Sequence, residues 1–179
     1  MRSTVPPPAS RAGSARSRFA TSAAGRPSSL SVSPGRPAVA VTSVAVGSLR
    51  LASRYPTLAR GSRSSLIAAR ADVAAAFADV DVRCRRALAT GGAARAARKL
   101  VGETLGPDRL QEALQASVAE PFEKLARRYD LAPHRTRTLA AGIVILAEVQ
   151  RRLGVPLEVS RSGLREGLAL ELLEDIAAA

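Results

Sequence analysis

The chain has 179 residues and a net charge of +12, from 27 lysines and arginines against 15 aspartates and glutamates. An aromatic content of 3% leaves few rings on which bases could stack, so the basicity alone does not indicate a nucleic-acid-binding protein. The length allows one ordinary domain whose core needs neither a disulfide nor a metal ion.

The basic charge is concentrated at the amino-terminal end. Residues 1–71 contain 11 arginines, no lysine and no acid, whereas residues 72–179 contain 16 basic and 15 acidic side chains. The first part therefore carries +11 and the second part +1. Because the second part is almost neutral and holds most of the apolar periodicity, the sequence disfavours nucleic acid as a partner.

Residues 1–37 show no apolar periodicity and consist mainly of Ser, Arg, Pro, Ala and Gly. Such a composition cannot form a core, so we predict a disordered basic tail over residues 1–37 and a folded domain over residues 38–179. Three interpretations of the tail are open. It is a solvated basic arm, an organelle transit peptide, or the product of a wrong frame or start site in a GC-rich gene.

The folded part begins with alternating apolar and small residues over 38–51, which predict two short strands or one strand bent at Gly47. A helix capped by Ser64 and Ser65 follows. Its apolar positions fall on roughly one face: Leu66, Ile67, Val73, Phe77 and Val80. Residues 87–100 then predict a strand, a tight turn and a helix.

The turn at Gly91 and Gly92 is a candidate binding site. Glycines permit a sharp turn and the close approach of another group, and the free amides at the start of the next helix suit an anion such as phosphate. The same dipeptide also serves to pack a helix on a sheet. Both interpretations are open for Gly91, Gly92 and Arg95.

Three further helices are predicted in the second half. One opens at Gly106-Pro107-Asp108, one covers about residues 118–129 with Phe122 and Leu125 inward, and the longest runs from Pro133 to about residue 153. The buried stripe of the longest helix is Leu139, Gly142, Ile143, Leu146, Val149 and Leu153.

Gly154 ends the longest helix, and residues 157–160 alternate as a short strand. A last amphipathic helix follows Gly163, with apolar residues four apart at Leu164, Leu168, Leu172 and Ile176. The order of strands and helices predicts an α/β or α+β fold rather than a helical bundle.

The single cysteine and the single histidine do not indicate a catalytic site. Cys84 has no partner for a disulfide and is predicted to be a small buried residue, while His134 is predicted to be exposed near a helix start. The longest apolar run, residues 139–147, is too short to cross a bilayer, so we expect a cytoplasmic protein without membrane contact.

Four stretches occur in an order that is informative as a set. They are Val44–Leu51, Thr90–Arg95, Arg98–Gly102 and Arg137–Leu173, and the last contains Gly-Leu-Arg-Glu-Gly at residues 163–167. Together they resemble the Ppx/GppA family of exopolyphosphatases and guanosine pentaphosphate phosphohydrolases. The resemblance covers about residue 38 to the end, and the Gly-Leu-Arg-Glu-Gly segment is its most specific part.

The resemblance implies an actin-like, ribonuclease-H-like fold in which two related α/β domains close around a phosphate chain and Mg²⁺. It implies that this chain is the second domain, a mixed sheet packed by helices. The first domain, with its Asp-x-Gly loop and the carboxylate that activates water, has no counterpart here. The implied reaction is release of the terminal phosphate from polyphosphate or pppGpp.

The resemblance also shows departures from the family pattern. The family's Asp-x-Gly-Gly-Gly-Ser loop corresponds to residues 23–29, where the acid is missing and Arg26 and Pro27 replace two glycines. Ser28 and Ser29 remain candidate phosphate ligands beside Gly91, Gly92 and Arg95, and Arg165 and Glu166 are expected to be structural. Mg²⁺ prefers carboxylate oxygens, and residues 1–71 contain none. We expect no catalytic residue, no metal ligand and no activity of the chain alone.

Two function classes remain open. The chain is either part of an exopolyphosphatase-like phosphohydrolase, or a non-catalytic α/β module whose basic arm binds polyanions or a protein partner. A domain separated from its sister exposes apolar surface, so we also expect a homodimer formed through that surface.

Overall fold

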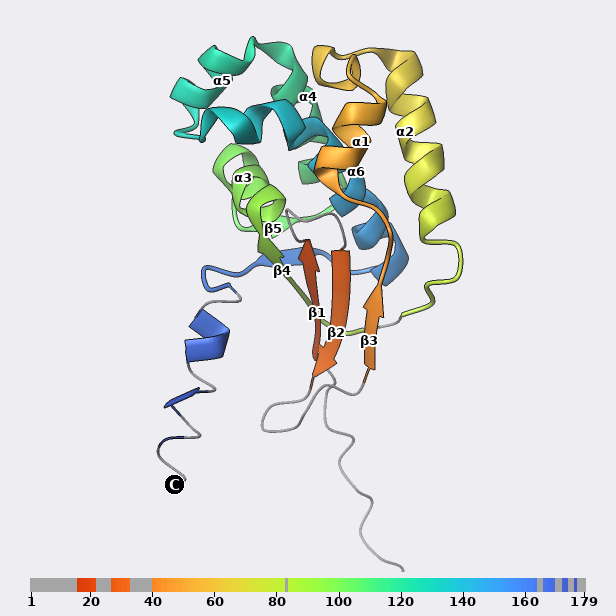
Figure 1. Cartoon of the computed structure of the whole chain (residues 1–179), viewed down its shortest axis with the longest axis vertical. Helices are drawn as coiled ribbons and strands as arrows, with labels where there is room; N and C mark the ends of the chain where they lie inside the picture. The colour runs from red at the N-terminus through yellow and green to blue at the C-terminus, as the bar shows by residue number, and fades with distance from the viewer. Residues whose placement is uncertain are drawn as a thin grey trace, which may run out of the picture.

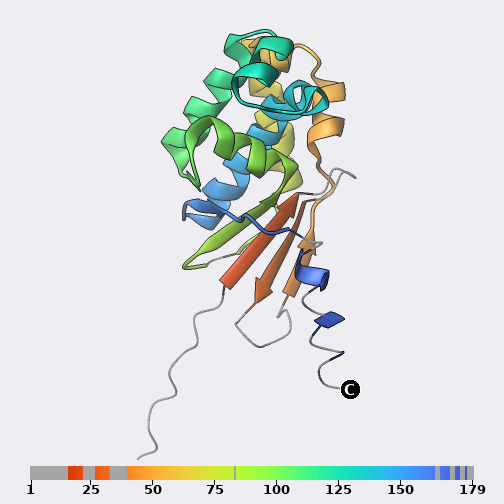
Figure 2. The same ribbon diagram turned by 90° about the vertical axis from the view of Figure 1, so that its left-hand side faces the viewer.

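The computed structural model describes residues 16–21, 27–32, 40–82, 84–163, 166–169, 172–173 and 176. The described residues form a mixed six-stranded sheet with helices gathered toward one end of its strands (Figures 1 and 2). The predicted α/β class, a mixed sheet packed by helices, is confirmed.

The strand order is β3-β2-β1-β4-β6-β5. β1 pairs in parallel with β4, and β4 pairs in parallel with β6. β2 is antiparallel to both β1 and β3, and β5 is antiparallel to β6. The strands are β1 (Arg16–Thr21), β2 (Pro27–Val32), β3 (Ala40–Ser43), β4 (Ala87–Gly91), β5 (Thr104–Leu105) and β6 (Leu157–Val159).

Two strands of this sheet fall within residues 1–37, which the sequence predicted as a disordered tail. β1 and β2 form a hairpin, and β1 pairs with β4 over Ser17–Thr21. Main-chain hydrogen bonds build these ladders and do not require an apolar side-chain pattern, which is why the Ser- and Arg-rich sequence gave no signal. The rest of residues 1–37 lies outside the described residues.

Seven helical segments of the described residues precede β6. They are α1 (Ser48–Arg54), a 3₁₀ turn (Leu58–Arg60), α2 (Arg63–Ala76), α3 (Gly92–Val101), α4 (Pro107–Ala119), α5 (Phe122–Arg128) and α6 (Pro133–Leu153). None of the helices so described is long and apolar enough to span a membrane.

Several predicted boundaries are wrong in the first half of the domain. Residues 48–51 belong to α1 rather than to a strand, with Leu51 buried and Leu49 exposed. α2 is capped by Ser62, whose Oγ accepts from the amide of Ser65, rather than by Ser64 or Ser65. Ile67, predicted on the apolar face of α2, is 62% exposed.

In the second half of the domain, the observed helices and strands agree more closely with those predicted from the sequence. β4, the Gly91-Gly92 turn and α3 are confirmed, as are α4 with Pro107 in its first turn and β6. The helix predicted over residues 118–129 is shorter, because Pro121 separates α4 from α5. Its predicted inward residue Leu125 is buried, whereas Phe122 is only partly buried.

α6 is the central helix of the domain and contacts each of the helices α1 to α5. Its predicted bounds, Pro133 and Gly154, are confirmed, and Gly154 ends the helix with φ at 67°. The predicted stripe is buried, and so are Val144 and Ile145 outside that stripe, because helices surround α6. After β6, residues 166–169, 172–173 and 176 are helical.

Candidate phosphate-binding site

The candidate site lies where β1 and β4 end side by side. The two strands are parallel neighbours, and Thr21, the last residue of β1, pairs with Gly91, the last residue of β4. From this point the sheet extends to β2 and β3 on one side and to β6 and β5 on the other. Ligands of open α/β sheets bind at the carboxyl ends of strands where the chain order diverges in this way.

Gly91 forms the sharp corner between β4 and α3. Its φ of 104° and ψ of 177° lie in a region that favours glycine, and α3 begins at the next residue. No side chain caps the start of α3. The first amides of α3 therefore have no partner within their own helix and carry the positive end of its dipole.

Gly92 makes room for an arginine rather than for helix packing. A Cβ atom at Gly92 would lie 2.5 Å from Cζ of Arg135 and closer still to Nη1. The close helix contact is made elsewhere, because a Cβ at Gly142 of α6 would lie 2.7 Å from Cβ of Ala93 in α3. The guanidinium of Arg135 therefore sits directly on the turn.

Arg135 was not among the candidate residues that the sequence indicated. It lies in the first turn of α6, a turn that contains no acid, and its guanidinium makes no ion pair with any described residue. A cation near two helix starts is disfavoured by both helix dipoles. The cluster His134, Arg135 and Arg137 at a helix start was the available sequence signal, since acids are normally preferred there.

Arg95 and the connection after β6 lie next to each other near the turn. Arg95 lies one turn into α3, is exposed and, like Arg135, has no ion-pair partner among the residues described. Thr90 Oγ1 donates to the carbonyl of Ser162 at 3.2 Å. A Cβ at Gly163 would lie 3.9 Å from Nη1 of Arg95, which places the connection next to this arginine.

Glu166 has the structural role that the sequence predicted for it. Its Oε2 accepts from the amide of Gly163 at 2.8 Å, and the amide of Gly167 donates to the Gly163 carbonyl. This pattern caps the start of the last helical segment. Arg165, which was also predicted to be structural, lies outside the described residues.

The structure does not bring Ser28 and Ser29 next to the turn. Both lie on β2, where Ser28 pairs with Ala20, and Ala20 pairs with Thr90. The backbone of Ser28 is therefore two strands, roughly 10 Å, from β4, and Ser29 lies one residue further along the strand. Residues 22–26, most of the loop that replaces Asp-x-Gly-Gly-Gly-Ser, lie outside the described residues.

The residues around the turn do not fit Mg²⁺. Among the described residues, no three His, Cys, Asp or Glu side chains lie close enough to hold a metal ion. The acid placed next to the turn, Glu166, already accepts from Gly163. Since Mg²⁺ needs several oxygen ligands, we derive no step through a metal ion for this chain.

The other candidate side chains have structural surroundings. Cys84 is half-buried rather than fully buried, and burial raises the pKa of its thiol, which opposes a nucleophilic role. His134 is exposed, as predicted. Arg151 and Arg152, predicted to need no ligand at a helix end, both bond Glu148.

Comparison with solved structures identifies the fold. The Aquifex aeolicus member of the Ppx/GppA family matches with a TM-score of 0.78 and 17% identity, over 92% of this chain and 58% of that one. An exopolyphosphatase from Cytophaga hutchinsonii matches with a TM-score of 0.77 and 11% identity, over 91% and 58%. A second structure of the Aquifex aeolicus enzyme matches with a TM-score of 0.76 and 16% identity, over 88% and 56%.

These matches cover only part of each similar protein. The chain spans between 56% and 58% of the length of these three structures. No protein-family profile and no curated protein sequence matches it. The sheet order, the helices around it and these structural matches together show that the chain has the α/β fold of part of the Ppx/GppA structures.

Proposed function

We propose that this chain forms the phosphate-binding wall of an exopolyphosphatase-like phosphohydrolase and has no catalytic machinery of its own. The observation that carries the proposal is the position of Arg135. Its guanidinium lies on Gly92, at the amide-bearing start of α3, without an acid to pair with among the described residues. An anion bound there would receive backbone amide and guanidinium hydrogen bonds together.

The local charges favour phosphate over a neutral ligand. Arg135, whose guanidinium lies against Gly92, and Arg95 of α3 contribute two positive charges near the α3 amides, and the helix dipole adds to them. A phosphoryl group offers several acceptor oxygens and matches the planar donor pattern of a guanidinium. Gly91, Gly92, Arg95 and Arg135 are therefore the proposed phosphate contacts. Ser28 and Ser29 lie two strands from β4 and are not among them.

Hydrolysis needs groups that we place outside this chain. Attack of water on a terminal phosphate requires a base that positions the water and cations that neutralise the developing charge. The described residues at the turn provide the arginines but neither a free carboxylate cluster nor a metal site. The base and the Mg²⁺ ligands would come from a complementary domain, consistent with the part of each matched structure that this chain does not span.

The proposed substrate class is a linear phosphate chain, either polyphosphate or the triphosphate of pppGpp. Both present the same terminal phosphoanhydride to the arginines. A titration with tripolyphosphate tests the shared chemistry, and a parallel titration with pppGpp tests whether the guanosine adds affinity.

A matched pair of variants tests the binding step. Arg135→Gln removes the guanidinium on Gly92, whereas Arg137→Gln removes an exposed arginine from the same helix. Loss of one charge-assisted hydrogen-bonding group costs about 1.5–3 kcal/mol, so we expect Arg135→Gln to weaken tripolyphosphate binding about 10- to 100-fold. Equal effects of the two substitutions in calorimetric titrations would reject the assignment of Arg135.

Activity provides an independent test. The chain alone, incubated with polyphosphate and Mg²⁺, should release no phosphate. Addition of a first domain taken from a Ppx/GppA enzyme should give phosphate release that Arg135→Gln reduces. If the chain binds tripolyphosphate but the added first domain gives no phosphate release, the binding site is retained and the phosphohydrolase proposal is rejected.

The alternative, a basic arm that binds polyanions, rests on the 11 arginines and absence of acids in residues 1–71. A deletion of residues 1–37 is not a suitable test of this alternative, because it would also remove β1 and β2 from the sheet. A deletion of residues 1–15 removes Arg2 and Arg11 and leaves the sheet intact. If that deletion abolishes salt-sensitive polyphosphate binding while Arg135→Gln has no effect, the arm is the binding element.

A further inference from the structure

A pocket of about 400 Å³ lies between the 3₁₀ turn, the end of α4 and the start of α5. These elements form the end of the molecule opposite the strands (Figure 1). Small-molecule sites commonly measure roughly 300–1,000 Å³, so the size of this pocket suits a small metabolite. Its lining combines apolar and charged side chains, among them Val118, Ala119, Phe122, Arg60, Glu120 and Glu123.

Glu120 contributes to this pocket a buried acceptor that has no donor. Its side chain is 15% exposed, and Nη1 of Arg128 donates to its Oε1. Its Oε2 is buried and accepts no hydrogen bond, and it is the one buried side-chain nitrogen or oxygen of the described residues in that state. Buried polar atoms normally have partners, and an unpaired charged one is especially costly. The carboxylate of Glu120 therefore indicates a missing donor.

Arg60 contributes a cation that has no acid. It is the last residue of the 3₁₀ turn, it is exposed, and its guanidinium forms no ion pair with any described residue. The turn is held against α4, because a Cβ atom at Gly61 would lie 3.6 Å from Cγ2 of Val118. Arg60 and Glu120 therefore line one pocket from two different elements.

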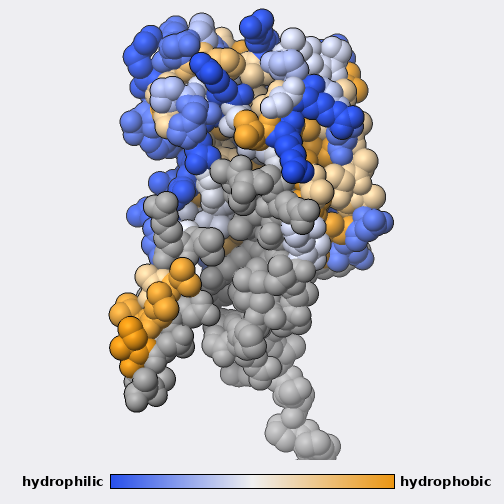
Figure 3. All heavy atoms as spheres, viewed as in Figure 1, coloured by the Kyte–Doolittle hydropathy of each residue, from blue (hydrophilic) through white to orange (hydrophobic). Residues whose placement is uncertain are grey.

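The charges around the pocket balance. Glu120 and Glu123 carry two negative charges, and Arg60 and Arg128 carry two positive ones. A ligand with no net charge but with separate positive and negative groups is complementary to this arrangement. Figure 3 shows a mostly hydrophilic surface over α5, which favours a small charged molecule over a large apolar partner.

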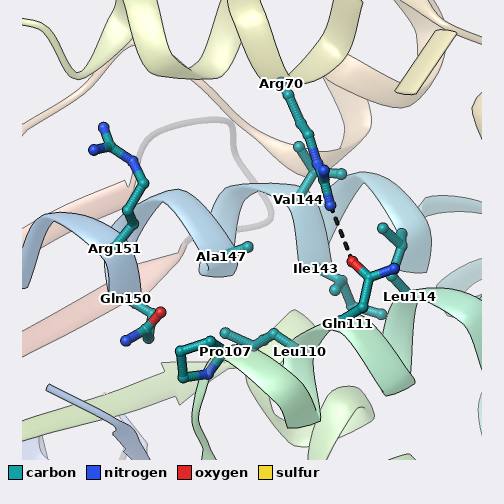
Figure 4. Close-up of a pocket in the computed structure, with 10 residues that line it drawn as sticks. All are labelled: Arg70, Pro107, Leu110, Gln111, Leu114, Ile143, Val144, Ala147, Gln150 and Arg151. Carbon is teal, nitrogen blue, oxygen red and sulfur yellow. Dashed lines mark hydrogen bonds between the residues drawn. The ribbon is translucent and has the colours of Figure 1, made fainter. Parts of the chain in front are cut away.

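A second cavity lacks these features. It measures about 210 Å³ and lies between α2, α4 and α6 (Figure 4). Arg70 at its edge donates to Oε1 of Gln111 at 3.1 Å, and none of the described residues that line it is an acid. It therefore offers no carboxylate to a cationic group, and the pocket beside Glu120 is the stronger ligand site.

We infer that the pocket beside Glu120 binds a free α-amino acid with a small apolar side chain. The ammonium group of the ligand donates to the Glu120 carboxylate and supplies the missing donor. The carboxylate of the ligand accepts from the Arg60 guanidinium, and its side chain packs against Val118 and Phe122. An α-amino acid is a small molecule that carries all three groups. The site shares no residue with the Gly91-Gly92 turn, so the inference does not depend on the proposed function.

Calorimetric titration of the full chain with free L-leucine and two analogues tests the ligand class. Isocaproate is leucine without its ammonium group, and isopentylamine is leucine without its carboxylate. Loss of a charge-assisted hydrogen-bonding group weakens binding about 10- to 100-fold, so we expect both analogues to bind at least about tenfold more weakly than leucine. Absence of leucine binding, or isocaproate binding as tight as that of leucine, would overturn the inference.

Variants of the full chain test the two proposed contacts. Glu120→Gln and Arg60→Gln should each weaken leucine binding about 10- to 100-fold. Arg63→Gln removes an exposed arginine that does not line the pocket and should have no effect. Arg128→Gln removes the partner of Glu120 but keeps the carboxylate, so leucine should still bind.

Two measurements keep this test independent of folding and of phosphate binding. Circular dichroism checks that each variant is folded, and Arg60→Gln changes an exposed side chain, so it tests the site even if Glu120→Gln unfolds the chain. Tripolyphosphate binding should be the same in Arg60→Gln and the wild type. Leucine binding that Arg60→Gln leaves unchanged would overturn the inference, whatever the outcome for phosphate.

Discussion

Gly92 and Gly142 differ in what an added methyl group would meet, and this difference separates binding from packing. At Gly92 the neighbour is the end of the Arg135 side chain, which can move, whereas at Gly142 it is the Cβ of Ala93, which cannot. We expect Gly142→Ala to lower the free energy of unfolding by about 1–3 kcal/mol, because it overpacks the contact between α3 and α6. Urea denaturation measures this change.

Two further variants serve as controls for Gly142→Ala. Ala93→Gly in the same chain removes the opposing methyl group and should restore part of the lost stability. Gly92→Ala should change stability by less than about 1 kcal/mol, while it displaces Arg135 and weakens phosphate binding. A loss of stability at Gly92 equal to that at Gly142 would mean that packing, rather than room for Arg135, explains the Gly91-Gly92 turn.

The hydrogen bonds of the Glu148 carboxylate predict that the free energy of unfolding depends on pH. Hydrogen bonds from Arg151, and then from Arg152, hold the pKa of this carboxyl below its ordinary value of 4.5 despite its burial. A group with a lowered pKa contributes stability above its unfolded pKa and loses this contribution as the pH falls through its folded pKa. The stabilising contribution of Glu148 should therefore be complete at neutral pH and decline below pH 4.5.

The measurement is the difference in unfolding free energy between the wild type and Glu148→Gln as a function of pH. We expect about 1–3 kcal/mol at neutral pH, and a smaller difference in acid. Glu112→Gln, which disrupts an ion pair whose side chains are 58% and 53% exposed, is the matched control and should cost less than about 1 kcal/mol. A difference for Glu148 that does not change with pH would contradict the pairing.

At the scale of elements, the β1–β2 hairpin belongs to the sheet of the domain. β1 covers the edge of β4, and its removal would expose an unpaired strand. A chain lacking residues 1–15 should keep the circular dichroism spectrum and melting temperature of the full chain. A chain lacking residues 1–37 should aggregate or melt at lower temperature. Equal melting temperatures of the two shortened chains would contradict the pairing of β1 and β2 with the rest of the sheet.

The sequence predicted elements best where local signals and tertiary packing agree. α6 was predictable because Pro133 begins it, Gly154 ends it and apolar residues recur between them. β1 and β2 were not, since a ladder of backbone hydrogen bonds holds their polar residues in the sheet. α1 was missed because the valine alternation before Gly47 suggested that the strand continued past it.

The candidate site was predictable only in part for a related reason. The Gly91-Gly92 corner and Arg95 are consecutive in sequence and form a recognisable turn. Arg135 is more than 40 residues away from Gly92 and reaches the turn only because α6 packs against α3. No local pattern encodes that contact.

At the scale of the whole molecule, we propose a domain that supplies arginines and helix amides to a phosphate chain while other groups perform hydrolysis. The fold matches proteins of greater length, and the described residues lack a metal site. The proposed function therefore requires that this chain alone binds phosphate.

Mapping of tripolyphosphate binding by amide chemical shifts tests that property most directly. We expect the largest shifts at the amides of residues 91–95 and a change in the side-chain signals of Arg135, both abolished by Arg135→Gln. Shifts confined to the arginines of residues 1–37, or an absence of shifts at the start of α3, would contradict it.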